Sequence, residues 1–216
     1  MRFEIPCAMD TTRWLLSASL IFFLTFSVHA QEREREHNKS SLGITFSSFG
    51  DNELVRLNDA VGFPGTTGKK FYTLGLNYLL PLNRTFDLET GLEYSYHKIM
   101  VDPNLPPSLD QPDYPIRMHI MTVPVAARLN FLKYLFFSAG GMLNLDLSNP
   151  GEADTQTGLG AIASLGVQYD FDFGMSIFIN PYIKANGLLP FAPDDYQQRL
   201  MVSGWRFGVL YQLTDE

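Results

Sequence analysis

The sequence of 216 residues lacks several features that would assign it to a common class of protein. Its only cysteine is Cys7, so a disulfide bond within the chain is excluded. No apolar run beyond residue 30 approaches the roughly 20 residues that a membrane-spanning helix needs, which excludes a helical membrane protein. Phosphate-binding and dinucleotide-binding glycine motifs, zinc-ligand spacing and a basic stripe are also missing. These absences predict no cofactor, no metal and no nucleic-acid partner.

The first 40 residues are typical of a targeting segment followed by a polar tail. Arg13 precedes an apolar stretch at 14–28, and the triplet VHA ending at Ala30 has the small-residue pattern of a signal-peptidase site. We therefore predict a cleaved signal peptide over residues 1–30. The alternative, an N-terminal membrane anchor, would need a longer apolar span. Residues 31–40 are charged and without periodicity, which predicts a short polar periplasmic tail.

Beyond residue 40 the dominant signal is an alternation of apolar and polar residues. Alternation at every second position is typical of β-strands that have two different faces. Most of the alternating segments have about the 9 to 11 residues that a tilted strand needs to cross a bilayer. The eight predicted strands cover residues 41–49, 71–81, 86–98, 116–131, 134–147, 158–171, 175–187 and 200–213.

The links between these segments are long and short in strict alternation. Long links follow the first, third, fifth and seventh segments, whereas the others are tight turns such as PLNRT and DFDFG. Outer-membrane barrels have this regularity because their short turns face the periplasm and their longer loops face outward. The sequence therefore predicts an all-β domain over residues 41–216, an eight-stranded antiparallel up-and-down transmembrane β-barrel.

One face of the predicted strands is apolar and is assigned to lipid. A cation at the centre of this face would cost about 2 to 4 kcal/mol, and none is found there. Arg117 shares the outward parity but lies at a loop end, where that cost falls to about 0 to 1 kcal/mol. The lipid-facing candidates are Leu74, Leu76, Tyr78, Leu80, Val123, Val125, Ala127, Leu129, Leu135, Phe137, Ala139, Leu143, Leu145, Leu159, Ala161, Ala163, Leu165, Val167, Tyr169, Trp205, Phe207, Val209, Tyr211 and Leu213.

Aromatic residues gather where the girdles of a membrane barrel would lie. We expect two girdles, formed by Phe131, Tyr169, Phe171 and Tyr211 at the short-turn end and by Tyr72 and Tyr96 at the long-loop end.

The opposite face is polar and is assigned to the barrel interior. An eight-stranded barrel is narrow enough for side chains to fill, and buried charges need partners. We therefore predict a barrel-interior polar network of Glu89, Glu93, Arg128, Lys184 and Arg206, in which Glu89 meets Arg128 and Glu93 meets Arg206. The other inward candidates are Asn77, Asp87, Asn144, Gln168, Asn180 and Gln212.

Two prolines fall inside predicted strands, at Pro124 and Pro181. A closed barrel has no free edge to host a residue without an N–H group. Local bulges at both prolines are therefore expected.

The stretch TVPVAARLNFLKYLFFSAGGMLNLDLS resembles the small outer-membrane β-barrel family common in Bacteroidetes, which is porin-like or OmpX-like. The following GLGAIASLGVQYDFDFGMSIFINPYIKANGLL is similar to the next hairpin of that family, and the resemblance covers the chain from about residue 41. The chain departs from the family at Thr122, Asn180 and Tyr182, where family members often carry charged residues. The resemblance implies a barrel in the cell outer membrane, surrounded by its lipids, and a protein partner in a secretion or envelope machinery. It implies no activity.

Three functions remain open from the sequence. The first is a structural or interaction protein that acts through its extracellular loops. The second is a lipid-modifying barrel enzyme, since Glu93, Ser95 and His97 share a strand face and His119 lies near the outer rim. Successive residues on one face of a strand are about 6 to 7 Å apart, too far for the hydrogen bonds of a catalytic triad. We therefore predict no catalytic residues. The third is a soluble lipocalin-like carrier, whose apolar face would point inward.

Overall fold

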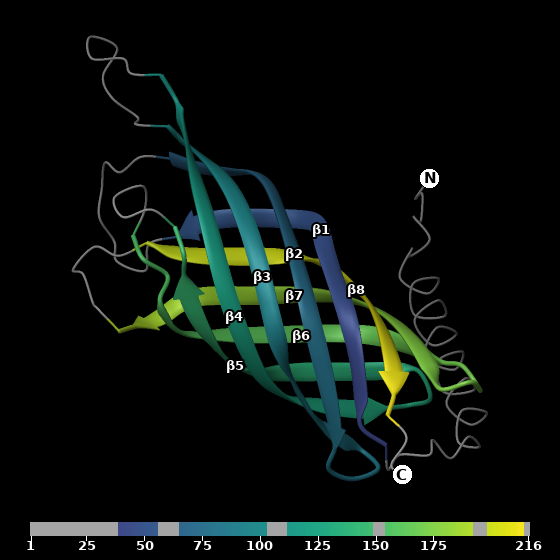
Figure 1. Cartoon of the computed structure of the whole chain (residues 1–216). Helices are drawn as coiled ribbons and strands as arrows, with labels where there is room; N and C mark the ends of the chain where they lie inside the picture. Colours follow the sequence, from purple (N-terminus) through teal and green to yellow (C-terminus); the bar gives the residue numbers. More distant parts are fainter. Residues whose placement is uncertain (1–38, 56–64, 103–111, 149–153, 192–197, 214–216) are drawn as a thin grey trace, which may run out of the picture. The chain divides into compact units, whose positions relative to one another are not determined.

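The structure is a computed structural model, and it describes residues 39–55, 65–102, 112–148, 154–191 and 198–213. In this part of the chain eight antiparallel strands form a closed barrel, in which sequence neighbours pair and β1 pairs with β8 (Figure 1). This arrangement confirms the predicted fold class. The strands are β1 (Ser41–Val55), β2 (Gly65–Pro81), β3 (Phe86–Asp102), β4 (Tyr114–Phe131), β5 (Leu135–Asp146), β6 (Gly158–Asp170), β7 (Met175–Pro190) and β8 (Arg199–Gln212).

The sequence predicted two features in the N-terminal segment, a signal peptide and a polar tail. The predicted signal peptide, residues 1–30, and most of the predicted tail at 31–40 lie outside the described residues. No helix in the described ranges has the length and apolar character to cross a membrane.

Several strands extend further at the long-loop end than the sequence predicted. β1 runs to Val55 instead of residue 49, β2 begins at Gly65 instead of residue 71, and β3 reaches Asp102. The end of β1 could not be predicted from the sequence. The pairing of β1 with β8 shifts between Ser47 and Phe49, and this bulge breaks the alternation of apolar and polar residues. Beyond the bulge the alternation resumes as far as the end of the strand.

The two prolines are accommodated without the bulges that the sequence predicted. The pairing of β3 with β4 keeps one register on both sides of Pro124, and the pairing of β6 with β7 does the same around Pro181. Paired positions are simply interrupted there, because proline has no N–H to donate. The hydroxyl of Thr90 donates to the carbonyl oxygen of Pro124 at 2.9 Å. Register shifts lie elsewhere, at Ser47/Phe49, Gly68/Lys70 and Leu159/Ala161.

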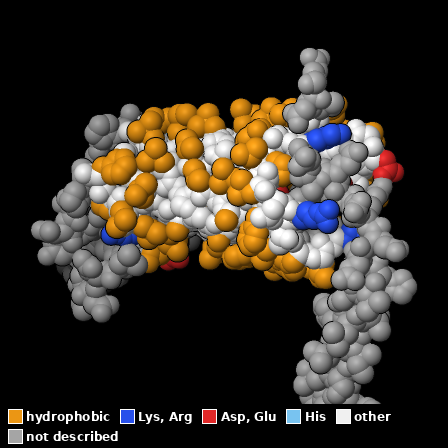
Figure 2. Space-filling model, turned by 90° about the horizontal axis from the view of Figure 1, so that it is seen from below, with side chains coloured by type: hydrophobic (Ala, Val, Ile, Leu, Met, Phe, Trp, Pro, Cys, Tyr) orange, Lys and Arg blue, Asp and Glu red, His pale blue; other side chains and the backbone are white. Residues whose placement is uncertain are grey.

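Side chains alternate across the barrel wall as the strand parity predicted. All the lipid-facing candidates are exposed or half-buried; Leu76 is 54% exposed, Val125 53% and Leu165 51%. The inward candidates are buried, except that Gln212 is half-buried. Figure 2 shows hydrophobic side chains spread along the visible side of the wall. The wall therefore has an apolar outer surface and a largely polar inner one.

The interior also contains apolar layers that the sequence did not reveal. Along β8 they flank Arg206, which lies between Val202 and Leu210. The larger cluster fills the long-loop end and consists of Leu54, Phe71, Ile99, Val101, Ile116, Met118, Ile120, Tyr182, Leu200 and Val202. The smaller cluster lies toward the short turns and consists of Leu79, Phe136, Phe178 and Leu210.

Candidate functional site

Four charged side chains form a compact cluster in the barrel interior. Glu89 and Glu93 project inward from β3, Lys184 from β7 and Arg206 from β8, and all four are buried. Arg206 bridges the two carboxylates, since its Nη2 donates to Oε1 of Glu89 at 2.9 Å and its Nη1 donates to Oε1 of Glu93 at 3.3 Å. Nζ of Lys184 donates to Oε2 of Glu93. The structure thus brings together the expected pair of Glu93 and Arg206, and the two charges of each sign balance inside the barrel.

Neutral side chains complete the hydrogen bonding of this cluster. Nδ2 of Asn77 donates to Oε1 of Glu89 at 3.0 Å, and the hydroxyl of Ser138 donates to Oε2 of the same carboxylate at 2.9 Å. Nε of Arg206 donates to Oδ1 of Asn180 at 3.2 Å. Since these groups come from β2, β5 and β7, the cluster links strands that are not neighbours in the barrel. The cluster therefore stabilises the barrel by connecting its strands across the interior.

Arg128 lies in the barrel interior near the short turns. The register of β3 and β4 places Arg128 opposite Asp87, two positions nearer the short turn than Glu89. Its guanidinium carbon lies 3.5 Å from the ring centroid of Phe136, a cation–π contact. Glu89 forms an ion pair with Arg206.

A second polar chain runs across the short-turn end. Arg128 donates to the side-chain oxygen of Gln168, and Nε2 of Gln168 donates to Oδ1 of Asp170 at 2.6 Å. On the other side, Nε of Arg128 lies 3.4 Å from Oδ1 of Asn130, whose Nδ2 donates to Oδ2 of Asp87 at 2.6 Å. The predicted network is thus two networks, one in the middle and one at the turn end.

Sequence reasoning missed several members of these networks. Ser138, Asn130 and Asp170 all have the inward parity of their strands, so parity applied to every polar residue would have found them. The contact of Lys184 with Glu93 carries no such signal. The two residues are 91 positions apart and lie on strands that do not pair.

The residues considered for catalysis do not make the contacts of a catalytic triad. Ser95 and His97 point into the interior, where His97 stacks on Phe71 with ring centroids 5.8 Å apart. Both oxygens of Glu93 are engaged by cations, so that carboxylate does not orient His97. His119 has the opposite parity and is half-buried on the outer face, away from Ser95. The geometry therefore supplies no triad from these residues.

An aromatic cluster marks the outer face near the long-loop end. Tyr72 stacks on Tyr96 with ring centroids 5.4 Å apart, and the ring of Tyr96 lies 5.1 Å from that of His119. The hydroxyl of Tyr94 is 2.7 Å from Nδ1 of His119. The cluster lies where the sequence predicted a long-loop girdle from Tyr72 and Tyr96, and it also contains Tyr94 and His119.

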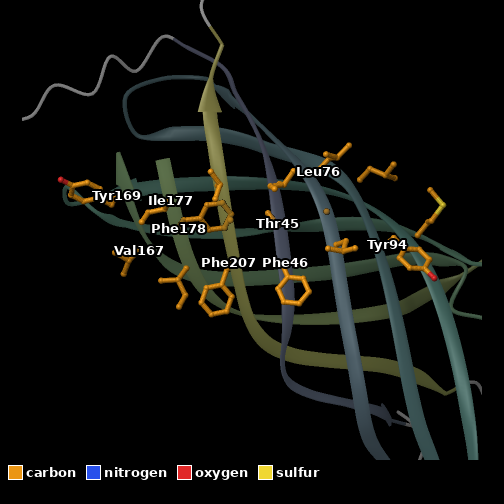
Figure 3. Close-up of a pocket in the computed structure, with 17 residues that line it drawn as sticks. Thr45, Phe46, Leu76, Tyr94, Val167, Tyr169, Ile177, Phe178 and Phe207 are labelled. Carbon is orange, nitrogen blue, oxygen red and sulfur yellow. The ribbon is translucent and has the colours of Figure 1, made fainter. Parts of the chain in front are cut away.

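An open apolar hollow of about 1030 Å³ lies along the wall and is lined from seven of the strands (Figure 3). Most of its lining side chains belong to the outer face; Phe46 of β1 and Phe207 of β8 are register partners, and both are exposed. Leu76 and Tyr94 line it on β2 and β3. The hollow therefore belongs to the apolar surface of the wall.

Taken as a class, the fold is a small closed barrel of eight antiparallel strands with a side-chain-filled interior. No protein-family model matches the chain, and no curated protein matches it. Similar solved structures include the outer membrane protein OprG from Pseudomonas aeruginosa, with a TM-score of 0.48, 12% identity and coverage of 82% of this chain and 97% of that one. The translocator domain of the autotransporter NalP from Neisseria meningitidis has a TM-score of 0.36, 8% identity and coverage of 96% and 100%. Similarity at this level identifies no activity for the chain.

Proposed function

We propose that the chain is an outer-membrane β-barrel protein with a structural or interaction role. The observation that carries this proposal is the composition of the outer wall. Ile44 is 64% exposed, Leu76 54% and Ile183 59%, on strands spread around the barrel. Soluble monomers rarely expose a continuous apolar surface of more than a few hundred Å². We therefore expect the apolar surface that encircles the barrel to contact lipid.

The position of the charged residues supports the same proposal. Within the described strands, the outward-facing charged side chains all lie near the long-loop end, for example Glu53, Lys70 and Arg117. The remaining length of each outer face is uncharged, as the hydrocarbon core of a bilayer requires. The long loops would then face the cell exterior and the short turns the periplasm.

The filled interior argues for a role other than transport. Arg206, Glu89 and Glu93 occupy the middle, and the apolar layer around Leu200 and Ile99 closes the long-loop end. Eight-stranded barrels have room for little else than their own side chains. Specificity would therefore reside in the long loops, which would contact a protein partner in a secretion or envelope machinery.

The sequence resemblance at 122–148 supports membership of the Bacteroidetes-type porin-like family. Arg13, the apolar stretch at 14–28 and the triplet VHA support export through a signal peptide at 1–30. The two alternative functions gain no support from the geometry. A soluble lipocalin-like carrier would turn its apolar face inward. A lipid-modifying enzyme would need a base within hydrogen-bond reach of a nucleophile, whereas His97 stacks on Phe71 and His119 lies on the face opposite to Ser95.

Expression of the full chain in a Gram-negative host tests the proposal. We expect the protein in the outer-membrane fraction, with an unboiled band that migrates differently from the boiled one and a β-rich circular dichroism spectrum. The mass of the mature chain should correspond to a start at Gln31. Folded protein that stays soluble without detergent would contradict the membrane assignment.

A further inference from the structure

The edge of β8 that faces β7 is completed by side chains at the long-loop end. Within the described residues, the pairing of β7 with β8 ends at Ala185 and Met201. Beyond that point β7 continues along β6, where Leu189 lies opposite Leu159. The first residues of β8 therefore need other partners for the N–H and C=O groups on this side, because buried main-chain groups are seldom left unpaired.

Three side chains bind four main-chain groups at the start of β8. Oδ2 of Asp154 accepts from the N–H of Gln198 at 2.8 Å, and Nε2 of Gln156 donates to the carbonyl oxygen of Gln198 at 2.9 Å. Oε1 of Gln156 accepts from the N–H of Leu200 at 2.9 Å, and Nδ2 of Asn186 donates to the carbonyl oxygen of Leu200 at 3.0 Å. A primary amide carries a donor and an acceptor as a peptide group does, so Gln156 takes the place of a neighbouring strand.

The segment that carries Gln156 is also tied to β5 and to the end of β7. The N–H of Gln156 donates to Oδ2 of Asp146, the last residue of β5, at 2.9 Å. Oγ1 of Thr157 accepts from the N–H of Asp146 at 3.0 Å, and the carbonyl oxygen of Thr157 accepts from the N–H of Phe191 at 3.3 Å. The link between β5 and β6 and the link between β7 and β8 are therefore joined through Gln156 and Asp154.

The position of Gln156 makes these contacts depend on one another. Neither Gln156 nor Leu200 has exposed surface, and Leu200 belongs to the apolar layer at this end of the interior. A buried amide is costly unless its donor and acceptor are both bound. Loss of one anchor therefore favours release of the whole segment.

We propose that Gln156 is a latch that gives the long-loop end two states. In the closed state it holds the two links together beside the apolar layer. In the released state the start of β8 loses its partners, and the layer around Leu200 becomes accessible. A protein partner that binds one link would then change the other, a step that rests on the proposed interaction role; the latch itself depends only on contacts within the chain.

Hydrogen exchange of single amides, followed by NMR of the full chain refolded in detergent, tests the latch. In Gln156→Leu we expect the amide of Leu200 to exchange on the order of 10-fold faster than in the wild type, because its acceptor is lost. The amide of Leu210, which lies opposite Ser176 of β7 on the same strand, should keep its rate. The matched control, Gln212→Leu, makes the same chemical change at the other end of β8 and should leave Leu200 unchanged.

Asp146→Ala distinguishes a latch from a local hydrogen bond. Asp146 anchors Gln156 from the side of β5, so only a coupled segment would transmit its loss to Leu200. We expect exchange at Leu200 to rise on the order of 10-fold in this variant too. Trypsin should also cleave after Arg199, next to the latch, faster in both variants than in the wild type.

Heat-modifiable migration and circular dichroism report first whether each variant forms the barrel. Asp146→Ala leaves the buried amide in place and decides the case if Gln156→Leu does not fold. An unchanged rate at Leu200 in folded Gln156→Leu would overturn the latch, and so would an unchanged rate in Asp146→Ala. Either result would leave the proposed membrane location and interaction role intact, since neither rests on these contacts.

Discussion

The inner and outer faces of the barrel wall carry opposite kinds of side chain although both alternate along the same strands. On β3, Glu89 and Glu93 point inward, whereas Leu92 and Tyr94 point outward. A slip of one residue in the pairing would turn the carboxylates to the outer face and the leucine to the lumen. Strand parity, and not average composition, therefore decides where each charge can lie.

The inner face also contains two contrasting regions, an ionic layer in the middle and an apolar layer at the long-loop end. In the middle, Arg206 holds two carboxylates with hydrogen bonds across the lumen. At the long-loop end, Leu200, Ile99 and Met118 are almost completely buried against one another without polar contacts between their side chains. The ionic layer depends on complete pairing, whereas the apolar layer depends on packing. Substitutions in the two layers should therefore destabilise the barrel by different mechanisms, through an unpaired charge in the ionic layer and through a cavity in the apolar layer.

The largest loss is expected from Arg206→Met. The substitution leaves Glu89 without its ion-pair partner and Glu93 with Lys184 alone, all of them buried. Removing one member of a buried charge cluster costs about 3 to 5 kcal/mol, because the remaining charge is uncompensated. Urea unfolding of the detergent-refolded protein, followed by tryptophan fluorescence, measures this loss.

Arg84→Met is the control for that experiment. Arg84 lies in the exposed turn between β2 and β3, so its replacement should change the free energy of unfolding by no more than about 0.5 kcal/mol. If Arg206→Met were as stable as the control, the interior cluster would not brace the barrel.

A similar but purely steric loss is expected in the apolar layer, from Leu200→Ala. Leu200 has no exposed surface, and its truncation leaves a cavity that costs about 2 to 5 kcal/mol. Met201→Ala, at the neighbouring outward position, should cost less because Met201 is 38% exposed and its truncation leaves no enclosed cavity. The same urea titration compares the two. A larger loss at Met201 than at Leu200 would show that the long-loop end is packed less tightly than the geometry indicates.

Most of the fold was predictable because alternation repeats in every strand and the link lengths fix the hairpin order. The strand ends were less predictable. Around Ser47 and Phe49 a bulge interrupts the alternation of β1, so Leu54, a member of the apolar layer, lay beyond the predicted strand. A bulge depends on pairing between chain segments, and one segment alone carries little trace of it.

The interior contacts were predictable by face but not by partner. Glu89 and Arg128 have the correct inward parity, yet the register of β3 and β4 sets Arg128 beside Asp87. The partner of Glu93 on β7, Lys184, is reached only because the barrel closes. Parity is local information, whereas contacts across the lumen depend on the shear of the whole barrel.

The free-energy cost of placing a charge on the outer face should depend on its depth in the bilayer. Leu165→Arg places a cation on the middle of β6, where Leu165 is 51% exposed and its neighbours on the outer face are apolar. In a bilayer this should cost about 2 to 4 kcal/mol, whereas Leu189→Arg, near the long-loop end of β7, should cost about 0 to 1 kcal/mol. Unfolding titrations in phospholipid vesicles measure both. Equal costs at the two depths would mean that no hydrocarbon layer surrounds the wall.

The smallest effect is expected from Ser95→Ala, which separates a structural interior from a catalytic one. Ser95 is 6% exposed and faces the lumen beside His97, whose Nδ1 has no hydrogen-bond partner among the described residues. Since neither side chain engages the other, removal of the hydroxyl should change the free energy of unfolding by no more than about 0.5 kcal/mol. An assay of phospholipid hydrolysis and acyl transfer with the folded wild type and variant provides the second measurement. A lipid-modifying activity present in the wild type and lost in folded Ser95→Ala would show that the inner face performs chemistry, and the contrast between a bracing interior and a lipid-binding exterior would have to be abandoned.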